Sequence, residues 1–298
     1  MEIQEDSGCS ENAKVTIYLH NGEVLKTNVM GGQAYIDISK HRTEDGSVYK
    51  PRLWSVTEPY LYRMIVETKE DRVESYFALR TIDIRKIMHV GNEVECVCLN
   101  GEPLFMHGVL DQGYFSDGIY TPAEEEEYER DVLRMKELGF NLLRKHIKIE
   151  PECFYYYCDK HGMLVMQDMI NNGDYNFVMD TALPTIGIKK YLNRRKRITQ
   201  VQKEFFEKHM LETLEHLYNH PCIIAYTIFN EGWGQFDAAR ITGWMRELDS
   251  SRLIDSTSGW FDQNCGDFIS IHNYFRPLSV PAKKWKHRGF DFHPNVGC

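Results

Sequence analysis

The sequence lacks several features that would place it in a class at once. Its 298 residues contain no run of about 18 apolar residues, so no membrane span is expected. The formal net charge is −9 and no basic stripe occurs, which argues against nucleic acid as the main partner. Residues 1–6 have neither a basic end nor an apolar stretch, so we do not expect them to be a signal peptide.

The eight cysteines lack a metal-binding pattern. No Cys-x-x-Cys occurs, and neither Cys96 with Cys98 nor Cys153 with Cys158 has a standard zinc spacing. Cys222 precedes an apolar run, as a small buried thiol would. We expect no metal and no cofactor, and a reducing compartment such as the cytoplasm, unless a leader was lost with a missing N-terminal part.

Residues 1–86 are rich in β-type segments. An Asn-Gly turn at residues 21–22 separates two such segments and indicates a tight hairpin. Five or six short strands are expected, where an immunoglobulin-like (Ig-like) sandwich needs about seven. We therefore predict a partial Ig-like β-sandwich. Its strands are expected at residues 15–19, 23–29, 34–38, 60–68 and 73–79.

From about residue 87 strands alternate with helices, which indicates a parallel sheet. Strands are expected at residues 105–109, 141–144, 163–167, 223–229, 253–256 and 268–271. Helices are expected at residues 121–138, 151–160, 201–218 and 236–248, the first of them opened by a capping box at Thr121. A doubly wound sheet would carry a glycine-rich phosphate loop, and none is present. Polar residues follow the strand ends, which favours an incomplete (β/α)8 TIM barrel of about six strands over residues 87–298.

Glu231 is the strongest candidate for a catalytic residue. It follows the apolar fourth strand of this barrel, between Phe229 and Trp233, so its charged form should be poorly solvated. Poor solvation raises the pKa of a carboxyl, as a general acid near neutral pH requires. Asn230 next to it can donate a hydrogen bond to a sugar hydroxyl. The alternative is a carboxylate that caps the following glycine-rich loop.

Several segments of the sequence resemble a known enzyme family. Residues 227–234, Thr-Ile-Phe-Asn-Glu-Gly-Trp-Gly, resemble the acid/base motif of glycoside hydrolase family 2, which includes β-galactosidases, β-mannosidases and β-glucuronidases. Further blocks that resemble this family lie at residues 53–62, 99–103, 107–109, 141–146 and 164–168. The resemblance spans nearly the whole chain. It implies a retaining, β-galactosidase-like hydrolase of O-glycosidic bonds, with a β-glycoside substrate and Glu231 as general acid/base.

The resemblance also implies a set of substrate-binding residues. These are Arg144, His146, Asp168, Asn230, Trp260, His272 and Tyr274. Arg144 would orient the catalytic carboxylates through charge-assisted hydrogen bonds, or else form a structural salt bridge. For His146 and His272 the alternative is a hydrogen-bonded core histidine, and for Asp168 it is a helix cap or an ion pair. Trp260 and Tyr274 could instead be aromatic rings that only pack.

Two further residues and one loop could also face this site. They are His107, Asp111 and the loop at residues 111–117, where Tyr114 and Phe115 could wall the pocket.

The nucleophile that this chemistry needs is missing from the sequence. Retaining glycosidases use two carboxylates, and family 2 members carry the second as a Glu on the seventh strand, whereas here no Glu follows Glu247. We expect the chain to be short at both ends and nearly inactive alone. Residues 291–298 are compatible with a shifted reading frame that encodes Phe-Ser-Ser-Glu-Cys-Gly, so a frameshift is one hypothesis.

Two other classes of function remain open from the sequence. One is a non-catalytic carbohydrate-binding protein that keeps the barrel pocket. The other is a metal-dependent hydrolase that uses His146, Asp168, Glu231 and His272, although no His-x-x-x-His spacing supports it. The sequence names neither the sugar nor the oligomeric state.

Overall fold

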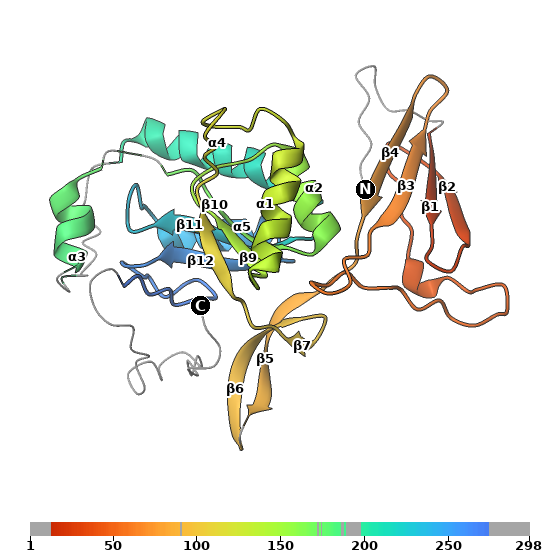
Figure 1. Cartoon of the computed structure of the whole chain (residues 1–298), viewed down its shortest axis with the longest axis horizontal. Coiled ribbons are helices and arrows are strands. Elements are labelled where there is room, and N and C mark those ends of the chain that lie inside the picture. Colours follow the sequence, from red (N-terminus) through yellow and green to blue (C-terminus); the bar gives the residue numbers. More distant parts are fainter. Residues whose placement is uncertain are drawn as a thin grey trace. The chain divides into compact units, whose positions relative to one another are not determined.

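The computed structural model describes residues 13–89, 91–171, 173, 175–185, 188 and 198–273. The chain divides into two compact units, Met1–Arg80 and Thr81–Cys298. Most strands and helices of each unit are labelled in Figure 1. The domain boundary expected after residue 86 falls inside strand β5 (Ile82–His89).

The first unit contains one four-stranded antiparallel sheet of order β2-β1-β3-β4, which is part of an Ig-like β-sandwich. Its strands are β1 (Lys14–Tyr18), β2 (Val24–Asn28), β3 (Tyr62–Glu67) and β4 (Arg72–Phe77). The predicted first hairpin is confirmed. Gly22 takes a positive φ of 90°, and its backbone N–H donates to the carbonyl of Leu19 at 3.1 Å.

The strand expected at residues 34–38 does not form. The Asp37 carboxylate accepts a hydrogen bond from the backbone N–H of Ser39, and this cap starts the short 3-10 helix η1 (Ile38–Lys40). Local side-chain capping of this kind competes with an extended backbone. Ile38 and Tyr49 from this connection join the hydrophobic core of the sheet, where the Tyr49 and Tyr62 hydroxyls lie 3.3 Å apart.

The second unit begins with a small antiparallel sheet that the sequence did not predict. Strand β5 pairs along its whole length with β6 (Asn92–Leu99), which then pairs with the short β7 (Glu102–Pro103). The change from strands to strand–helix alternation therefore starts only after this sheet.

Five parallel strands then form an incomplete (β/α)8 TIM barrel, with the order β12-β11-β10-β9-β8. The strands are β8 (Gly108–Asp111), β9 (Leu142–Lys145), β10 (Leu164–Asp168), β11 (Ile223–Asn230) and β12 (Leu253–Ser258). All residues of β11 are buried, as expected for a strand covered on both faces.

The sixth strand expected at residues 268–271 is absent from the described part of the chain. Asp267 does lie beside β12, where its backbone N–H donates to the carbonyl of Ile254 at 2.7 Å. The Asp267 side chain, not a backbone carbonyl, accepts the N–H of Ile254 at 2.8 Å. The backbone hydrogen bonding of a regular β-strand is therefore not continued after Asp267.

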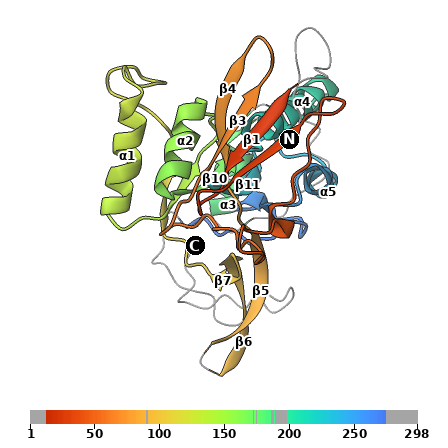
Figure 2. The same ribbon diagram turned by 90° about the vertical axis from the view of Figure 1, so that its right-hand side faces the viewer.

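Helices α1 (Glu126–Glu137) and α2 (Glu152–His161) lie side by side in Figure 2. Three further helical segments belong to this unit: α3 (Leu183–Thr185), α4 (Gln200–Leu217) and α5 (Ala238–Leu248). A short π-helix, η2 (Phe177–Ala182), precedes α3. None of the helices in the described part of the chain combines the length and the apolar character needed to cross a membrane.

Among the longer helices, the start of α1 differs most from the sequence expectation. α1 begins at Glu126 and not at Thr121, because the Asp117 carboxylate takes the backbone N–H of Ala123 at 3.1 Å and holds residues 121–125 as a bend. The expected capping box at Thr121 is therefore wrong. α4 does begin with such a box, formed by Thr199 and Gln202.

Candidate active site

Glu231 occupies a constrained turn at the end of β11. Its φ is 55°, a left-handed value that is uncommon outside glycine, and its backbone N–H donates to the Ser258 carbonyl at 2.8 Å. The next residue, Gly232, has a φ of 75°, and a Cβ there would lie 2.2 Å from a ring carbon of Phe261. Unfavourable backbone of this kind persists where the surroundings fix it, often at functional sites.

The Glu231 carboxyl contacts a histidine. Its Oε1 lies 2.6 Å from Nδ1 of His272, and the Glu231 side chain is 21% exposed. On the other side of the ring, His272 Nε2 lies 2.9 Å from the Ser258 hydroxyl and 3.4 Å from Nη1 of Arg144. Glu231 is thus linked through one imidazole to a cation on another strand.

Arg144 joins the ends of three neighbouring strands. Its guanidinium forms a two-point ion pair with Asp168, with N–O distances of 3.0 Å each, and Nη2 donates to Oδ1 of Asn230 at 2.9 Å. Asp168 is only 1% exposed, so this pair is shielded from water. Two parallel N–H···O bonds fix the plane of both groups. Arg144, Asp168 and Asn230 therefore form one rigid cluster at the carboxyl end of the sheet.

His146 and Trp260 also belong to this neighbourhood. Burial lowers the pKa of His146, while the nearby charge of Asp168 acts in the opposite direction. The indole N–H of Trp260 lies 2.8 Å from the carbonyl of Glu231 and 3.1 Å from that of Asp180. The only polar atom of the Trp260 side chain is therefore hydrogen-bonded to main-chain carbonyls. Tyr274 lies outside the described residues.

Sequence reasoning missed Asp255 on β12. It is buried, Ser270 donates a hydrogen bond to its Oδ2, and its Oδ1 has no partner in the described part of the chain. Burial raises the pKa of this carboxyl, while the hydrogen bond from Ser270 and the charge of Arg144 act against that rise. The only signal in the sequence was an acidic residue inside an otherwise uncharged strand.

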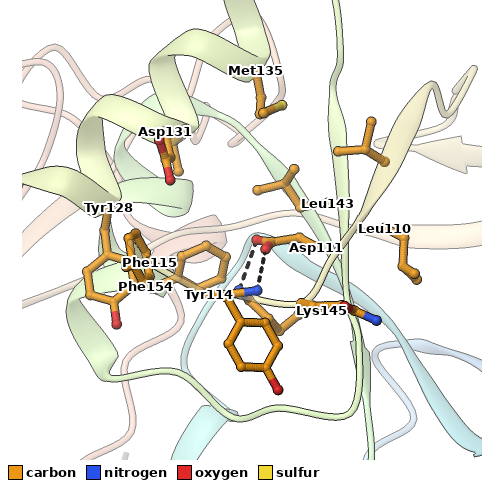
Figure 3. A pocket seen from close by; sticks show the side chains of 14 residues that line it. Leu110, Asp111, Tyr114, Phe115, Tyr128, Asp131, Met135, Leu143, Lys145 and Phe154 are labelled. Carbon is orange, nitrogen blue, oxygen red and sulfur yellow. Dashed lines mark hydrogen bonds and ion pairs between the residues drawn. The ribbon is translucent and has the colours of Figure 1, made fainter. Parts of the chain in front are cut away.

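Four residues expected at this site lie elsewhere. Asp111 pairs in register with Lys145, and its carboxylate contacts the Lys145 ammonium at 2.9 Å, whereas Arg144 pairs with Leu110. Tyr114 and Phe115 line a cavity of about 310 Å³ together with Asp111 and Lys145 (Figure 3). The residues that line this cavity do not include Glu231 or Arg144.

His107 precedes β8, and its ring Nδ1 lies 3.3 Å from the carbonyl of Gly139. It is therefore at the opposite end of the strand from the expected site.

The face that carries this cavity holds a buried ionic cluster. Lys145 Nζ lies 2.6 Å from Glu150 Oε1, and Lys148 Nζ lies 2.9 Å from the same oxygen. Tyr128 donates to the other oxygen of Glu150 at 3.1 Å. These contacts satisfy both lysines, so they do not contribute free cations to the Glu231 neighbourhood. Among the residues that the structure describes, no group of three or more His, Cys, Asp or Glu is arranged to hold a metal ion.

Comparison with protein families gives two matches. Residues 90–284 match the model described as "Glycosyl hydrolases family 2, TIM barrel domain", and residues 1–80 match "Glycosyl hydrolases family 2". A beta-galactosidase of Leuconostoc mesenteroides is 26% identical over 273 residues, which cover 88% of this chain and 24% of that protein. A beta-galactosidase of Aeromonas hydrophila is 29% identical over 233 residues, 74% of this chain and 20% of that protein. The chain thus spans about a quarter or less of these relatives.

Solved structures show the same fold. The beta-D-glucuronidase of Dictyoglomus thermophilum superposes with a TM-score of 0.60 at 17% identity, over 82% of this chain and 39% of that one. A beta-glucuronidase of an uncultured Clostridium gives a TM-score of 0.59 at 19% identity, over 83% of this chain and 38% of that one. At these identities the likeness extends to the fold alone.

Proposed function

The chain belongs to glycosyl hydrolases family 2, and from that premise we propose that it carries the acid/base side of a retaining β-glycosidase site of the β-galactosidase kind. Glu231 is the general acid/base, and the substrate is a β-glycoside. No cofactor takes part in this proposal.

One observation carries the proposal: the Glu231 carboxyl is joined through His272 to the Arg144–Asp168–Asn230 cluster. A retaining glycosidase needs a carboxyl that first protonates the leaving oxygen and then removes a proton from water. Glu231 is suited to this exchange because it is partly exposed and held in one orientation. Nδ1 of His272 can donate a hydrogen bond to the ionised form of Glu231 or accept one from its protonated form, depending on the tautomer.

The remaining residues of the cluster would bind the sugar. Asn230 presents its amide group to hydroxyls, Asp168 supports the sugar site by fixing Arg144, and His146, whose pKa is lowered by burial, can donate or accept one hydrogen bond. Arg144 holds Asp168 and Asn230 in place and is a positioning residue, as is His272. Trp260 acts by packing against His272, with ring centroids 5.8 Å apart, and by fixing the backbone of Glu231.

We assign no second carboxylate within the described part of the chain. Retaining chemistry places it about 5–5.5 Å from the first. Asp168 has both carboxylate oxygens bound by Arg144, and no Glu follows Glu247 in the sequence. We therefore expect the chain alone to bind glycosides and to hydrolyse them very slowly.

A small anion can test the acid/base assignment without a protein nucleophile. Azide attacks the anomeric carbon of 4-nitrophenyl β-galactoside, the bond to the leaving oxygen breaks, and Glu231 gives its proton to that oxygen. The expected product is α-galactosyl azide, identified by NMR, together with 4-nitrophenol. Screening the β-mannoside and the β-glucuronide in parallel shows which sugar fits.

Two outcomes would decide against the proposal. Formation of the azide at the same rate by Glu231→Gln, with the fold checked by circular dichroism, would remove the assignment of Glu231. Saturable sugar binding with no azide product would instead favour a carbohydrate-binding protein without catalysis. A carbohydrate-binding protein is the second candidate because the sequence has no Glu after Glu247 that could serve as the nucleophile.

A further inference from the structure

We propose that Trp233 and Tyr175 form a leaving-group subsite that binds aromatic aglycones next to Glu231. This inference rests on the proposed function, because the leaving group is defined by the carboxyl that protonates it. Tyr175 follows β10 in the chain, and Trp233 lies in the turn after β11.

Trp233 lies just after Glu231 in the sequence and forms one side of this subsite. Its indole N–H donates to the carbonyl of Gly173 at 2.9 Å, which ties the turn after β11 to the segment after β10. Gly173 has a φ of 90°, which favours glycine, and a Cβ there would lie 3.5 Å from the Cα of Gly234 in the turn after β11. The close approach of the two segments is therefore built into the sequence.

Tyr175 and Phe177 are two exposed aromatic side chains near Trp233 in this proposal, and Tyr175 contacts it. The Tyr175 ring lies 5.5 Å from the Trp233 ring at an angle of 62°, an edge-to-face arrangement. Tyr175 is 51% exposed and Phe177 is 63% exposed. The Tyr175 hydroxyl lies 2.6 Å from the Thr181 hydroxyl, which holds the phenol and leaves its ring accessible.

The segment is anchored to the acid/base residue through Trp260. One indole N–H contacts both the carbonyl of Glu231 and the carbonyl of Asp180, and Asp180 lies within η2. The side chain of Asp180 in turn accepts the backbone N–H of Asn176 at 2.8 Å, directly after Tyr175. The aromatic surface and the Glu231 backbone are thus held by one connected set of hydrogen bonds. Short π-helical turns are frequent at functional sites.

The chemistry of the reaction selects the occupant. The acid protonates the leaving oxygen, so the aglycone must lie on the side of Glu231 and not on the side of the sugar cluster. Trp233, Tyr175 and Phe177 are uncharged, and their ring faces favour an aromatic group over a hydrated one. An aromatic β-glycoside therefore gains contacts here that a methyl glycoside lacks.

Binding of two non-hydrolysable thioglycosides tests this subsite. Isothermal titration of the chain with phenyl and methyl 1-thio-β-galactoside should give an affinity about 3- to 10-fold higher for the phenyl compound, the range expected for one aromatic pair. Tyr175→Ala should remove most of this preference and leave methyl thioglycoside binding unchanged. Tyr175→Phe should keep it, because the ring remains. Tyr114→Ala, at an exposed tyrosine of the cavity beside Lys145, is the matched control and should change neither affinity.

The subsite and the proposed function can fail separately. Equal affinities for the two thioglycosides, or an equal loss of both in Tyr175→Ala, would overturn the subsite while Asp168→Ala still abolishes methyl thioglycoside binding. Methyl thioglycoside binding that Asp168→Ala leaves unchanged would overturn the proposed function, and the subsite with it.

Discussion

Oε1 of Glu231 and Nδ1 of His272 lie 2.6 Å apart, although 41 residues separate them in the sequence. The same imidazole contacts Ser258 and Arg144 through its other nitrogen. A proton gained or lost by Glu231 therefore changes the hydrogen bonding of a histidine that is held on both sides.

Replacing His272 by Ala should lower the azide-dependent rate on 4-nitrophenyl β-galactoside by about 10- to 100-fold, because a general acid contributes about 10²–10⁴-fold and a misplaced one keeps part of that. It should also shift the pH profile of that rate, since the partner of Glu231 is lost. A rate profile of unchanged shape in His272→Ala would show that the contact has only a structural role.

His146 should make the fold less stable in mild acid. Burial lowers its pKa below the ordinary value of about 6.5, so between these two values the unfolded chain binds a proton that the folded chain does not. Stability is then lost as the pH falls through this window. The free energy of unfolding from urea titrations at pH 7 and pH 5 should fall less in His146→Gln than in the wild type. An equal fall in both proteins would contradict this.

Asp255 should have the opposite pH dependence. Burial raises its pKa, so above pH 3.8 the folded chain keeps a proton that the unfolded chain has lost. Its contribution to stability is therefore present at low pH and is lost as the pH rises through the folded pKa. Asp255→Asn should be more stable than the wild type at pH 7, with a gain that shrinks toward pH 4. A gain that does not depend on pH would argue against this assignment.

The buried ionic cluster should be costly to break. Glu150→Ala leaves Lys145 and Lys148 buried without their shared carboxylate, and removal of one partner from a buried pair costs about 3–5 kcal/mol. The control is Glu129→Ala, at a more exposed ion pair with Lys160, where a loss below about 1 kcal/mol is expected. Chemical denaturation gives the loss in the free energy of unfolding. Equal losses in the two variants would contradict the larger contribution expected of the buried cluster.

Much of the second unit could be predicted because its signals are local. The apolar run of β11 and the glycine that ends α2, Gly162 with a φ of 69°, each specify their element without help from distant residues. The sheet of β5 and β6 was missed because its burial pattern is weak on β5, where exposed and half-buried residues mix.

The prediction of the site failed where it depended on strand register. The strand expected at residues 105–109 is found at Gly108–Asp111. Successive side chains of a strand point to opposite faces, so a small error in register decides which residue faces the site. Asp111 therefore pairs with Lys145 on the face that carries the cavity, while Leu110 is the register partner of Arg144. Glu231 and Asp168 could be placed at strand ends from the sequence because the apolar runs that precede them are local signals, and their roles remain predictions.

The leaving-group dependence of Glu231→Gln tests the acid/base role most directly. Azide-dependent cleavage should be compared for phenyl β-galactoside, whose departing oxygen needs a proton, and 2,4-dinitrophenyl β-galactoside, whose departing oxygen hardly does. Substitution of Glu231 by Gln should slow the phenyl substrate by about 10²–10⁴-fold and the dinitrophenyl substrate by less than about 10-fold. Equal slowing of the two substrates, or none, would contradict the role given to Glu231.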